Sequence, residues 1–426
     1  MELNLKYGRE IVKGKLPLSN CQELLPKPCK AAITDLSAHL RQKLNHPTKG
    51  PALNEIVKPG ERVVILVSDI TRLWNRTRDY LPTILAYLEE CSIEPSDICI
   101  LIARGCHRSQ TEAELEEIVG KEIFAKYEVV EHDADDPDGL SYVGTTSREN
   151  AVYVNRRVAE ADRVILTGGI IHHAMAGFGG GRKSILPGVA GRQTVEHNHL
   201  YTLHPTEIAI NPAIGSNKLE GNPLHEDMVD AAALVNPDFL VNAVLDPQNE
   251  IVDFFTGHWL DAWLAGCELV NDIYGVPFAE QGDLVVASCG GFPYDISLYQ
   301  ASKTFYNAGL ATKEGGSLIL LIQAQDGPGS DDFFGWYDNE TSEQFYHNLK
   351  ANFSIPGYLA YLIYTIAQSR KVYVVTDCDA AMVAKMGVVP TATLQEAIDQ
   401  ACADLQDDAK VWIIPEGGFT FPIMKS

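Results

Sequence analysis

Short, uninterrupted hydrophobic runs recur along this chain, and amphipathic segments of helical length separate them. In the first part of the chain the runs are Arg62–Ser68, Asp97–Ala103 and Arg163–Gly168. Runs of this length, rich in Val and Ile, predict strands that are buried on both faces. The first run is followed by a polar loop and then by Tyr80–Glu90, which has the hydrophobic spacing of a helix. This alternation predicts βα units around a mostly parallel sheet.

A second series of such runs follows a helical segment near Trp259–Tyr274. Its members are Leu284–Ser288, Ser317–Ile322, Lys371–Thr376 and Val411–Pro415. A chain of 426 residues is longer than one average domain, so the two series indicate two domains.

We therefore expect an α/β protein with two domains, each containing a mostly parallel sheet flanked by helices. We place the N-terminal domain at residues 1–277 and the C-terminal domain at residues 278–401. We expect residues 402–426 to pack back on the N-terminal domain.

Composition narrows the class of protein. Hydrophobic residues make up 46% of the chain and charged residues 21%, as in globular proteins with a substantial core. The formal net charge of −23 argues against a nucleic-acid-binding protein, because a phosphate backbone requires clustered Lys and Arg. We recognise neither a signal peptide nor an apolar run of membrane-spanning length, and we expect a cytoplasmic protein that binds no membrane. The nine cysteines form no CxxC pair, which predicts neither a disulfide framework nor a cysteine zinc site.

Charged residues and histidines follow each of the first three predicted strands. The loops are Asp69–Arg76, Arg104–Gln110 and the long segment His172–His199. Ligands of open α/β sheets bind at the carboxyl ends of the strands, so these loops are expected to line one crevice. Four cations close to glycines or histidines are candidates for binding a small anion, namely Arg72, Arg182, Lys183 and Lys303.

The glycine-rich segment Gly177–Ser184 (GFGGGRKS) is similar to two phosphate-binding motifs but matches neither of them. A P-loop needs glycine where Arg182 stands, and the dinucleotide pattern GxGxxG fails at the same position. What remains is an amide-rich loop with two adjacent cations, which suits a phosphate monoester or a carboxylate. The alternative is an ordinary glycine turn.

Histidines accompany this loop on both sides. His107 alone is more often a structural residue than a catalytic one. His172 and His173 are adjacent, so we expect only one of them to point into the crevice. If the HNH segment were extended, His197 and His199 would face the same side and one or both could bind a metal. No HExxH motif or carboxylate cage accompanies them, which favours a metal that comes with an organic cofactor.

Several separated motifs together carry a family resemblance. They are Asp69-Ile70-Thr71-Arg72, Gly105-Cys106-His107-Arg108, His173 ten residues before Lys183, His199 sixteen residues after it, and GGFPYDISLYQASK at Gly290–Lys303. In these motifs the chain resembles the nickel-pincer lactate racemases and related 2-hydroxyacid racemases or epimerases. Two departures are Leu73, where the family often has proline, and Arg104, at a place that is usually uncharged or small.

The resemblance implies a cofactor and a set of residue roles. The cofactor would be the nickel(II) complex of a pyridinium-3,5-bisthiocarboxylate mononucleotide, attached covalently to Lys183, with His199 as the protein's ligand to nickel. His107 and His173 would be the two acid/base residues. The other positions that would receive the cofactor or the substrate's anion are Asp69, Ile70, Thr71, Arg72, Gly179, Gly180, Gly181, Tyr299, Gln300 and Lys303. The site would lie in the crevice between the domains, and proteins of cofactor biosynthesis would be partners.

The resemblance also implies a reaction. A hydride would pass reversibly from C2 of a 2-hydroxy acid to the cofactor, through a 2-oxo acid, while one histidine takes the hydroxyl proton. A sugar-acid 2-epimerase of the same family is an alternative, and a non-catalytic protein that binds a phosphorylated ligand is another. The identity of the 2-hydroxy acid and the roles of His172 and His197 stay open.

Overall fold

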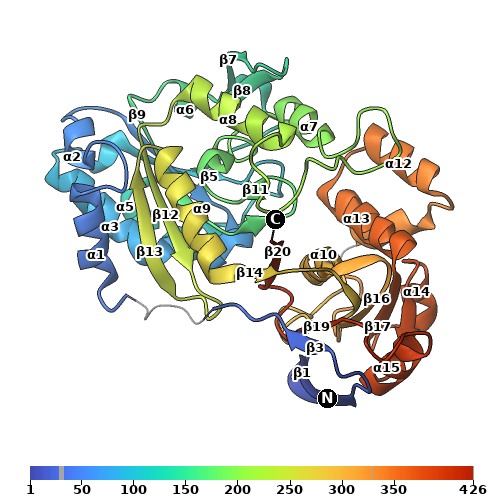
Figure 1. Ribbon diagram of the computed structural model, residues 1–426. Coiled ribbons are helices and arrows are strands. Elements are labelled where there is room, and N and C mark those ends of the chain that lie inside the picture. The colour runs from blue at the N-terminus through green and yellow to red at the C-terminus, as the bar shows by residue number, and fades with distance from the viewer. Residues whose placement is uncertain (28–32, 330, 426) are drawn as a thin grey trace. The chain divides into compact units, whose positions relative to one another are not determined.

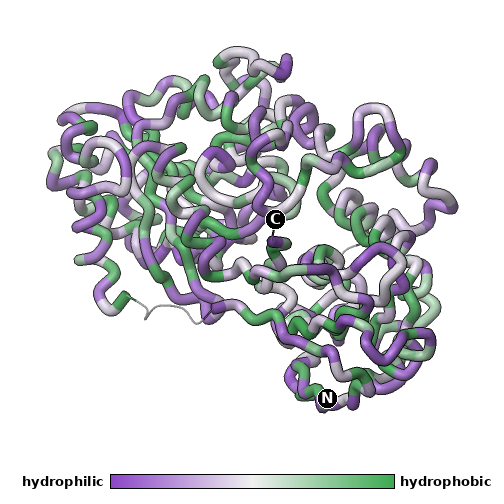
Figure 2. Tube along the Cα trace, in the orientation of Figure 1, coloured by the Kyte–Doolittle hydropathy of each residue, from purple (hydrophilic) through white to green (hydrophobic). Residues whose placement is uncertain are grey.

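The chain folds into two compact units, each of which is described by itself. The computed structural model describes residues 1–27, 33–329 and 331–425 (Figure 1). The first unit comprises Cys29–Pro205 and Asn211–Asp272. The second unit comprises Met1–Pro28, Thr206–Ile210 and Ile273–Ser426. Hydrophobic and hydrophilic stretches alternate along the whole trace, as an alternation of buried strands with loops requires (Figure 2).

The first unit contains a six-stranded sheet that confirms the predicted α/β class. Its strand order is β13-β12-β9-β4-β5-β6, and every neighbouring pair is parallel except β12 with β13 at the edge. The three predicted strands correspond to β4, β5 and β9. The bounds are β4 (Val63–Ser68), β5 (Ile98–Ala103), β6 (Glu128–Glu131), β9 (Arg163–Gly169), β12 (Phe239–Leu245) and β13 (Ile251–Gly257).

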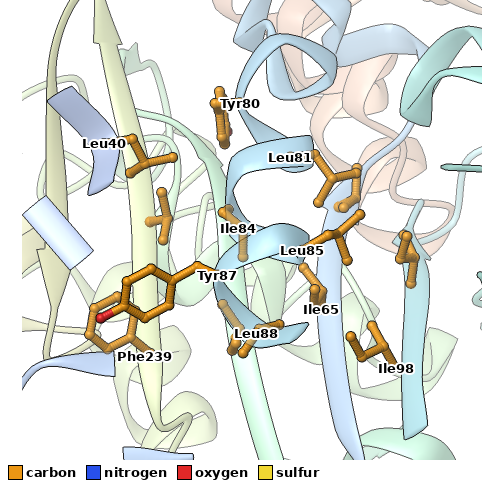
Figure 3. Packing of buried hydrophobic residues seen from close by; sticks show 14 of the residues in the cluster. Leu40, Ile65, Tyr80, Leu81, Ile84, Leu85, Tyr87, Leu88, Ile98 and Phe239 are labelled. Atoms are coloured by element: carbon orange, nitrogen blue, oxygen red, sulfur yellow. The ribbon is translucent and has the colours of Figure 1, made fainter. Parts of the chain in front are cut away.

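Helices cover this sheet, and α3 shows how the sequence pattern does so. Tyr80, Leu81, Ile84 and Leu88 recur at helical spacing and are fully buried in the cluster that contains Ile65 of β4 (Figure 3). The main helices of the unit are α1 (Leu36–Asn45), α3 (Thr77–Glu90), α4 (Glu112–Val119), α5 (Lys121–Lys126), α7 (Arg192–Leu200), α8 (Pro223–Val235) and α9 (Asp261–Tyr274). Two hairpins complete it, β7 (Leu140–Thr145) with β8 (Ala151–Asn155) and β10 (His172–His173) with β11 (Gly177–Phe178).

The second unit contains another six-stranded sheet, in which all neighbouring strands are parallel. The order is β18-β17-β16-β15-β19-β3. The strands are β3 (Cys21–Glu23), β15 (Gly282–Ser288), β16 (Thr312–Leu321), β17 (Lys371–Val375), β18 (Val389–Thr391) and β19 (Val411–Ile414). The helices are α10 (Ser302–Ala311), α11 (Asp331–Phe334), α12 (Ser342–Ala351), α13 (Ile355–Ser369), α14 (Ala380–Ala384) and α15 (Leu394–Cys402).

The division of the chain differs from the predicted one at both ends. The N-terminal residues belong to the second unit, because β3 adds a strand to β19 and the hairpin β1 (Glu2–Tyr7) with β2 (Glu10–Lys15) contributes Leu3 and Leu5 to that core. The final residues also stay in the second unit. There β19 lies inside the sheet, and β20 (Phe421–Met424) pairs with β14 (Gly275–Phe278). The chain enters this unit at Ile273, close to the predicted boundary.

No helix within the described ranges is long and apolar enough to cross a membrane. The eight cysteines that the structure describes are all free thiols, and Cys29 lies outside the described residues.

Candidate active site

The three predicted loops follow neighbouring strands of the first sheet. Strand β4 lies between β9 and β5, and all three run in the same direction. Their carboxyl ends therefore lie at one edge of the sheet, as the sequence predicted. Strand β4 leads into the 3₁₀ turn Ile70–Asn75, β5 into Arg104–Gln110, and β9 into the β10–β11 hairpin.

The first two loops bring Asp69 and His107 into direct contact. Nδ1 of His107 lies 2.6 Å from Oδ2 of Asp69, whose side chain is 3% exposed. The hydroxyl of Thr71 donates to Oδ1 of Asp69 at 2.7 Å, and Arg72 donates to that hydroxyl at 2.9 Å. Burial alone would raise the pKa of Asp69, but the hydrogen bonds and charges of His107, Thr71 and Arg72 outweigh it, so the pKa lies below its usual value. An ionised Asp69 accepts the Nδ1 proton, which leaves Nε2 as the nitrogen of His107 that can take a proton.

Arg104, one of the departures from the family pattern, holds the His107 loop. Its guanidinium donates to the carbonyl of His107 and lies 3.4 Å from a carboxylate oxygen of Asp133. Gly105 adopts a φ of 55°, and its amide donates to the carbonyl of Gly188 at 2.9 Å. Arg104 therefore stabilises the conformation that presents His107.

The adjacent histidines of β10 contact different partners. Nε2 of His172 donates to Oδ1 of Asn271 at 2.8 Å, and burial lowers the pKa of His172 to about 4. Nε2 of His173 instead lies 2.9 Å from Nζ of Lys183. The expected divergence of two neighbouring side chains on a strand is therefore observed, and only His173 contacts the lysine.

Lys183 and His173 share a cationic environment. Both side chains are half-buried. Burial first, and then the positive charges of Arg182 and Arg72, hold the pKa of Lys183 well below its ordinary value. Burial first, and then the positive charges around it, including those of Arg72 and Arg182 and that of Lys183 whenever it is protonated, do the same to the pKa of His173. The lysine thus lies where a neutral amine is favoured and an anionic ligand is attracted.

Two of the glycines before Lys183 already use their backbone amides within the protein. The amide of Gly179 donates to the carbonyl of Ile171 at 2.7 Å, and the amide of Gly181 donates to Oδ1 of Asn242 at 2.8 Å. Gly180 has a φ of 72°, and Gly181 has a φ of 55° with room for no Cβ beside Trp263. The amides of Gly179 and Gly181 thus have donors in use, and a contact of Gly179, Gly180 or Gly181 with the cofactor stays a prediction.

Arg182 is buried in the glycine loop and does not offer its charge to solvent. Its side chain is 0% exposed and lies 3.9 Å from the ring centroid of Trp263. The guanidinium donates to the carbonyls of Ala176 at 2.6 Å and Phe178 at 2.9 Å, and to Nδ1 of His225 at 3.1 Å. Burial lowers its pKa to about 9. Arg182 therefore fixes the loop that carries Lys183, a role that the sequence pattern did not reveal.

His199 lies on helix α7, not on an extended segment. Its Nδ1 donates to the carbonyl of Val195 at 2.7 Å, which places the lone pair of the neutral imidazole on Nε2. Burial lowers the pKa of His199 to about 4. His197 points elsewhere, because its Nε2 lies 3.1 Å from the hydroxyl of Tyr201. The two histidines were expected to share a side only if the segment were extended, and that condition is not met because the segment is helical.

Three predicted site residues lie in the second unit. Gln300 precedes helix α10, and Lys303 lies in its first turn; both side chains are exposed. The ring of Tyr299 packs edge-on against Phe333 with centroids 5.5 Å apart. The backbone N–H of Gln300 donates to the hydroxyl of Ser297 at 3.2 Å.

Sequence reasoning missed three residues that shape the site of the first unit. Asn242 holds the amide of Gly181, His225 accepts from Arg182, and Trp263 stacks on the guanidinium and donates to the carbonyl of Gly179 at 2.8 Å. All three lie on elements that also build the core, and their spacing in sequence carries no signal. Within the described part of the chain, no three His, Cys, Asp or Glu side chains come together to hold a metal ion by themselves.

Known proteins resemble this chain along most of its length. The model of the lactate racemase N-terminal domain matches residues 7–210, and that of the lactate racemase C-terminal domain matches residues 278–420. The lactate racemase of Thermoanaerobacterium thermosaccharolyticum is 31% identical over 423 residues, which are 97% of each protein. The lactate racemase of Lactiplantibacillus plantarum is 32% identical over 424 residues, 97% of this chain and 98% of the relative.

Solved structures agree with these matches. The lactate racemase apoprotein from Thermoanaerobacterium thermosaccharolyticum superposes with a TM-score of 0.88 at 30% identity, and the match covers all of both chains. A Thermotoga maritima protein shares the fold alone, with a TM-score of 0.61 at 18% identity over 92% of this chain and 97% of that one. Both domain models and both relatives lead to one conclusion: the chain belongs to the lactate racemase family of isomerases.

Proposed function

We propose that this protein is a racemase or epimerase of 2-hydroxy acids that works with a nickel-pincer nucleotide attached to Lys183. The observation that carries the proposal is the 2.9 Å contact between Nζ of Lys183 and Nε2 of His173. It joins an amine suited to covalent attachment to a histidine suited to proton chemistry. In the same unit the second histidine, His107, contacts the buried carboxylate of Asp69.

The residues present fit such a cofactor. A half-buried amine with a lowered pKa is suited to forming an amide-type bond. The tautomer of His199 places a lone pair on Nε2, as a metal ligand requires. No three side chains of the described residues hold a metal by themselves, so a metal bound by His199 would need further ligands, and an organic group can supply them. The positive charges of Arg72 and Arg182 favour a group that carries phosphate and thiocarboxylate.

The chain's own residues then divide the proton chemistry. The bound cofactor supplies an acceptor for the hydrogen of the substrate's C2 as hydride. His107 takes the hydroxyl proton through Nε2, and the charge of Asp69 stabilises the imidazolium that forms. His173 acts on the opposite face of the planar carbonyl. Arg72, whose side chain is exposed at the same loop, binds the carboxylate of the substrate.

Tyr299, Gln300 and Lys303 of the second unit stay predicted contacts of the cofactor or the substrate. On this proposal Lys303 binds the substrate's carboxylate or the cofactor, so Lys303→Met is expected to raise KM about tenfold or more with a smaller effect on kcat. Steady-state racemisation by loaded enzyme measures both constants. An unchanged KM would remove Lys303 from the site.

Intact mass spectrometry tests the proposed attachment. Protein produced together with the cofactor-biosynthesis proteins should carry an adduct of the mass of the cofactor, and Lys183→Ala should lose it. Lys121→Ala, at an exposed lysine of helix α5, is the matched control and should keep it. Absence of the adduct from the wild-type protein, or its retention by Lys183→Ala, would overturn the proposal.

Substrate choice is a separate question with its own experiment. Loaded enzyme is incubated with pure enantiomers of short aliphatic, aromatic, dicarboxylic and sugar-acid 2-hydroxy acids, and chiral chromatography follows the products. Inversion of a sugar acid at C2 alone would make the protein a sugar-acid 2-epimerase rather than a racemase of simple 2-hydroxy acids.

A further inference from the structure

The ring of His173 is fixed by three hydrogen bonds. The amides of Met175 and Ala176 both point at Nδ1, each at 3.2 Å. On the other side of the ring, Nε2 lies 2.9 Å from Nζ of Lys183. All four residues belong to one continuous segment that runs from β10 to the 3₁₀ turn Gly181–Ser184.

This pattern determines where the proton of His173 lies. A ring nitrogen that accepts from two backbone N–H groups carries no hydrogen, so Nδ1 is unprotonated. The single proton of the neutral imidazole is then on Nε2, which must donate to Nζ of Lys183. An ammonium group has three donors and no lone pair, and it accepts no hydrogen bond. The contact is therefore compatible with a neutral amine at Lys183 and not with an ammonium.

The charges around the lysine support the same protonation state. The charged groups that act on it are the guanidinium of Arg182 in its own turn and that of Arg72 in the turn after β4. His199 of helix α7, which burial keeps neutral, also interacts electrostatically with the lysine. Lys183 forms no ion pair with a carboxylate among the residues that the structure describes. Cations on two sides and no paired anion disfavour a third positive charge.

We propose that His173 and Lys183 form an acyl-acceptor site in the apoprotein, in which His173 holds Lys183 as a free amine ready to attack a carboxylic or thiocarboxylic carbon. The inference rests on the proposed function in that the cofactor's thiocarboxylate is taken as the natural acyl donor. The amine nitrogen forms the new bond to carbon, and the bond from that carbon to its oxygen leaving group breaks. The donor reacts in its acid form, so the oxygen leaves as a hydroxyl group, and one proton of the amine joins it to give water. No oxidant or reductant is involved.

An ordinary lysine offers far less of the reactive form. With a pKa near 10.4, only about one lysine in 2,500 is a free amine at pH 7. A lysine held fully neutral therefore gains up to about 2,500-fold in the concentration of its nucleophilic form. Limited access of the reagent to the buried amine reduces the observed gain in rate. The gain is independent of the identity of the acyl donor, so a simple reagent reports it.

The experiment labels the apoprotein, purified from a host without the cofactor pathway. N-acetoxysuccinimide is used in limiting amount between pH 6.5 and pH 9, and peptide mass spectrometry gives the rate constant at Lys183 and at the exposed reference Lys121. The rate at Lys121 should rise about tenfold per pH unit, because its ammonium must first lose a proton. The rate at Lys183 should be nearly constant and at least about tenfold above that of Lys121 at pH 7.

Variants of the two adjacent histidines separate this role from a structural one. His173→Phe removes the donor and should restore a steep pH dependence at Lys183. His173→Gln keeps an N–H donor and should retain part of the flat profile, which covers the case that the Phe variant does not fold. His172→Gln, at the neighbour that contacts Asn271 instead, is the matched control and should behave like the wild type.

A steep profile at Lys183 in the wild-type protein would overturn the inference, and so would a flat profile in folded His173→Phe. Limited access lowers the rate at every pH without changing the slope, so the slope decides. Neither the reagent nor the apoprotein involves nickel or the nucleotide. A failure to find the cofactor adduct would therefore contradict the proposed function alone, while a steep labelling profile would contradict this inference alone.

Discussion

The carboxylate of Asp69 decides which nitrogen of His107 can act as a base. It accepts from Nδ1 at 2.6 Å, and its replacement by an amide removes both the negative charge and the tautomer preference. Asp69→Asn is therefore expected to lower kcat by about two to four orders of magnitude. Racemisation followed by chiral chromatography measures it, with adduct mass as the check on cofactor loading. A kcat within threefold of the wild type at equal loading would contradict the role of Asp69.

Replacement of Arg182 is expected to lower the free energy of unfolding strongly. Its guanidinium donates to three carbonyls and to His225 inside the protein, and its removal would leave these four acceptors without their donor. Arg182→Met should reduce the free energy of unfolding by about 3–5 kcal/mol, and Arg182→Lys by nearly as much, because an ammonium cannot reproduce the planar fork.

Urea denaturation measures this difference. The control is Arg41→Met, at a partly exposed arginine that pairs with Glu90 across two helices. That substitution should cost about 1 kcal/mol or less. Equal losses for the two methionine variants would show that Arg182 is not a special support of the loop.

Two neighbouring glycines of the loop before Lys183 differ in the room that a side chain would find there. Gly180 has a φ of 72°, and a Cβ there would lie 2.6 Å from Oδ1 of Asn242. A Cβ at Gly179 would meet nothing closer than 3.5 Å. Gly180→Ala should destabilise the protein by about 2–4 kcal/mol, from backbone strain and overpacking, and Gly179→Ala by about 1 kcal/mol or less.

The urea midpoint of each variant checks this, and the labelling rate at Lys183 reports whether the loop has moved. Similar midpoints for the two alanine variants would mean that the loop adapts and that its close packing does not set the position of the lysine.

The central strands were predictable because the signal is local. Val63–Ser68 and Ile98–Ala103 are continuous hydrophobic stretches that differ from the predicted strands by one residue at the start. The two-residue strands of the β10–β11 hairpin have no such signal, because they depend on the turn between them. The helix that carries His199 was missed because its polar sequence, RQTVEHNHL, has no hydrophobic stripe. Local patterns thus located the sheet, while contacts distant in sequence shaped the site.

At the scale of the whole molecule, buried histidines make stability depend on pH. Burial lowers the pKa of His132 to about 4 and that of His225 to about 3. In the unfolded chain both titrate near 6.5, so between pH 6.5 and pH 4 the unfolded state binds protons that the folded state does not. The free energy of unfolding should therefore be highest above pH 6.5 and fall as the pH is lowered towards 4, by on the order of 3 kcal/mol from His132 alone.

Urea denaturation at pH 7.5 and pH 5.0 measures this loss. His132→Gln should reduce the difference between the two pH values, whereas His347→Gln, at an exposed histidine of helix α12, should leave it unchanged. An equal loss in wild type and His132→Gln would assign the acid sensitivity to other groups.

The division into units was the least predictable feature of the whole molecule. Strand β3 has only three residues, and its place beside β19 depends on a pairing between positions about 390 residues apart. No periodicity in a short strand specifies so distant a partner. The family motifs, by contrast, lie in loops at adjacent strand ends, where the structure brings Asp69 into contact with His107 and His173 into contact with Lys183. Their proposed roles in the reaction stay predictions.

The contact between His173 and Lys183 has a consequence for enzyme maturation. Once Lys183 is acylated, its nitrogen lone pair is delocalised into the new amide-type bond and no longer accepts a hydrogen bond. The Nε2–H of His173, still directed by the amides of Met175 and Ala176, then loses its acceptor. On the proposed function, the oxygen on C2 of the substrate would take the place of that acceptor. The same proton of His173 would thus serve assembly of the holoenzyme first and turnover afterwards, and His173 would become available for turnover only after the cofactor is attached.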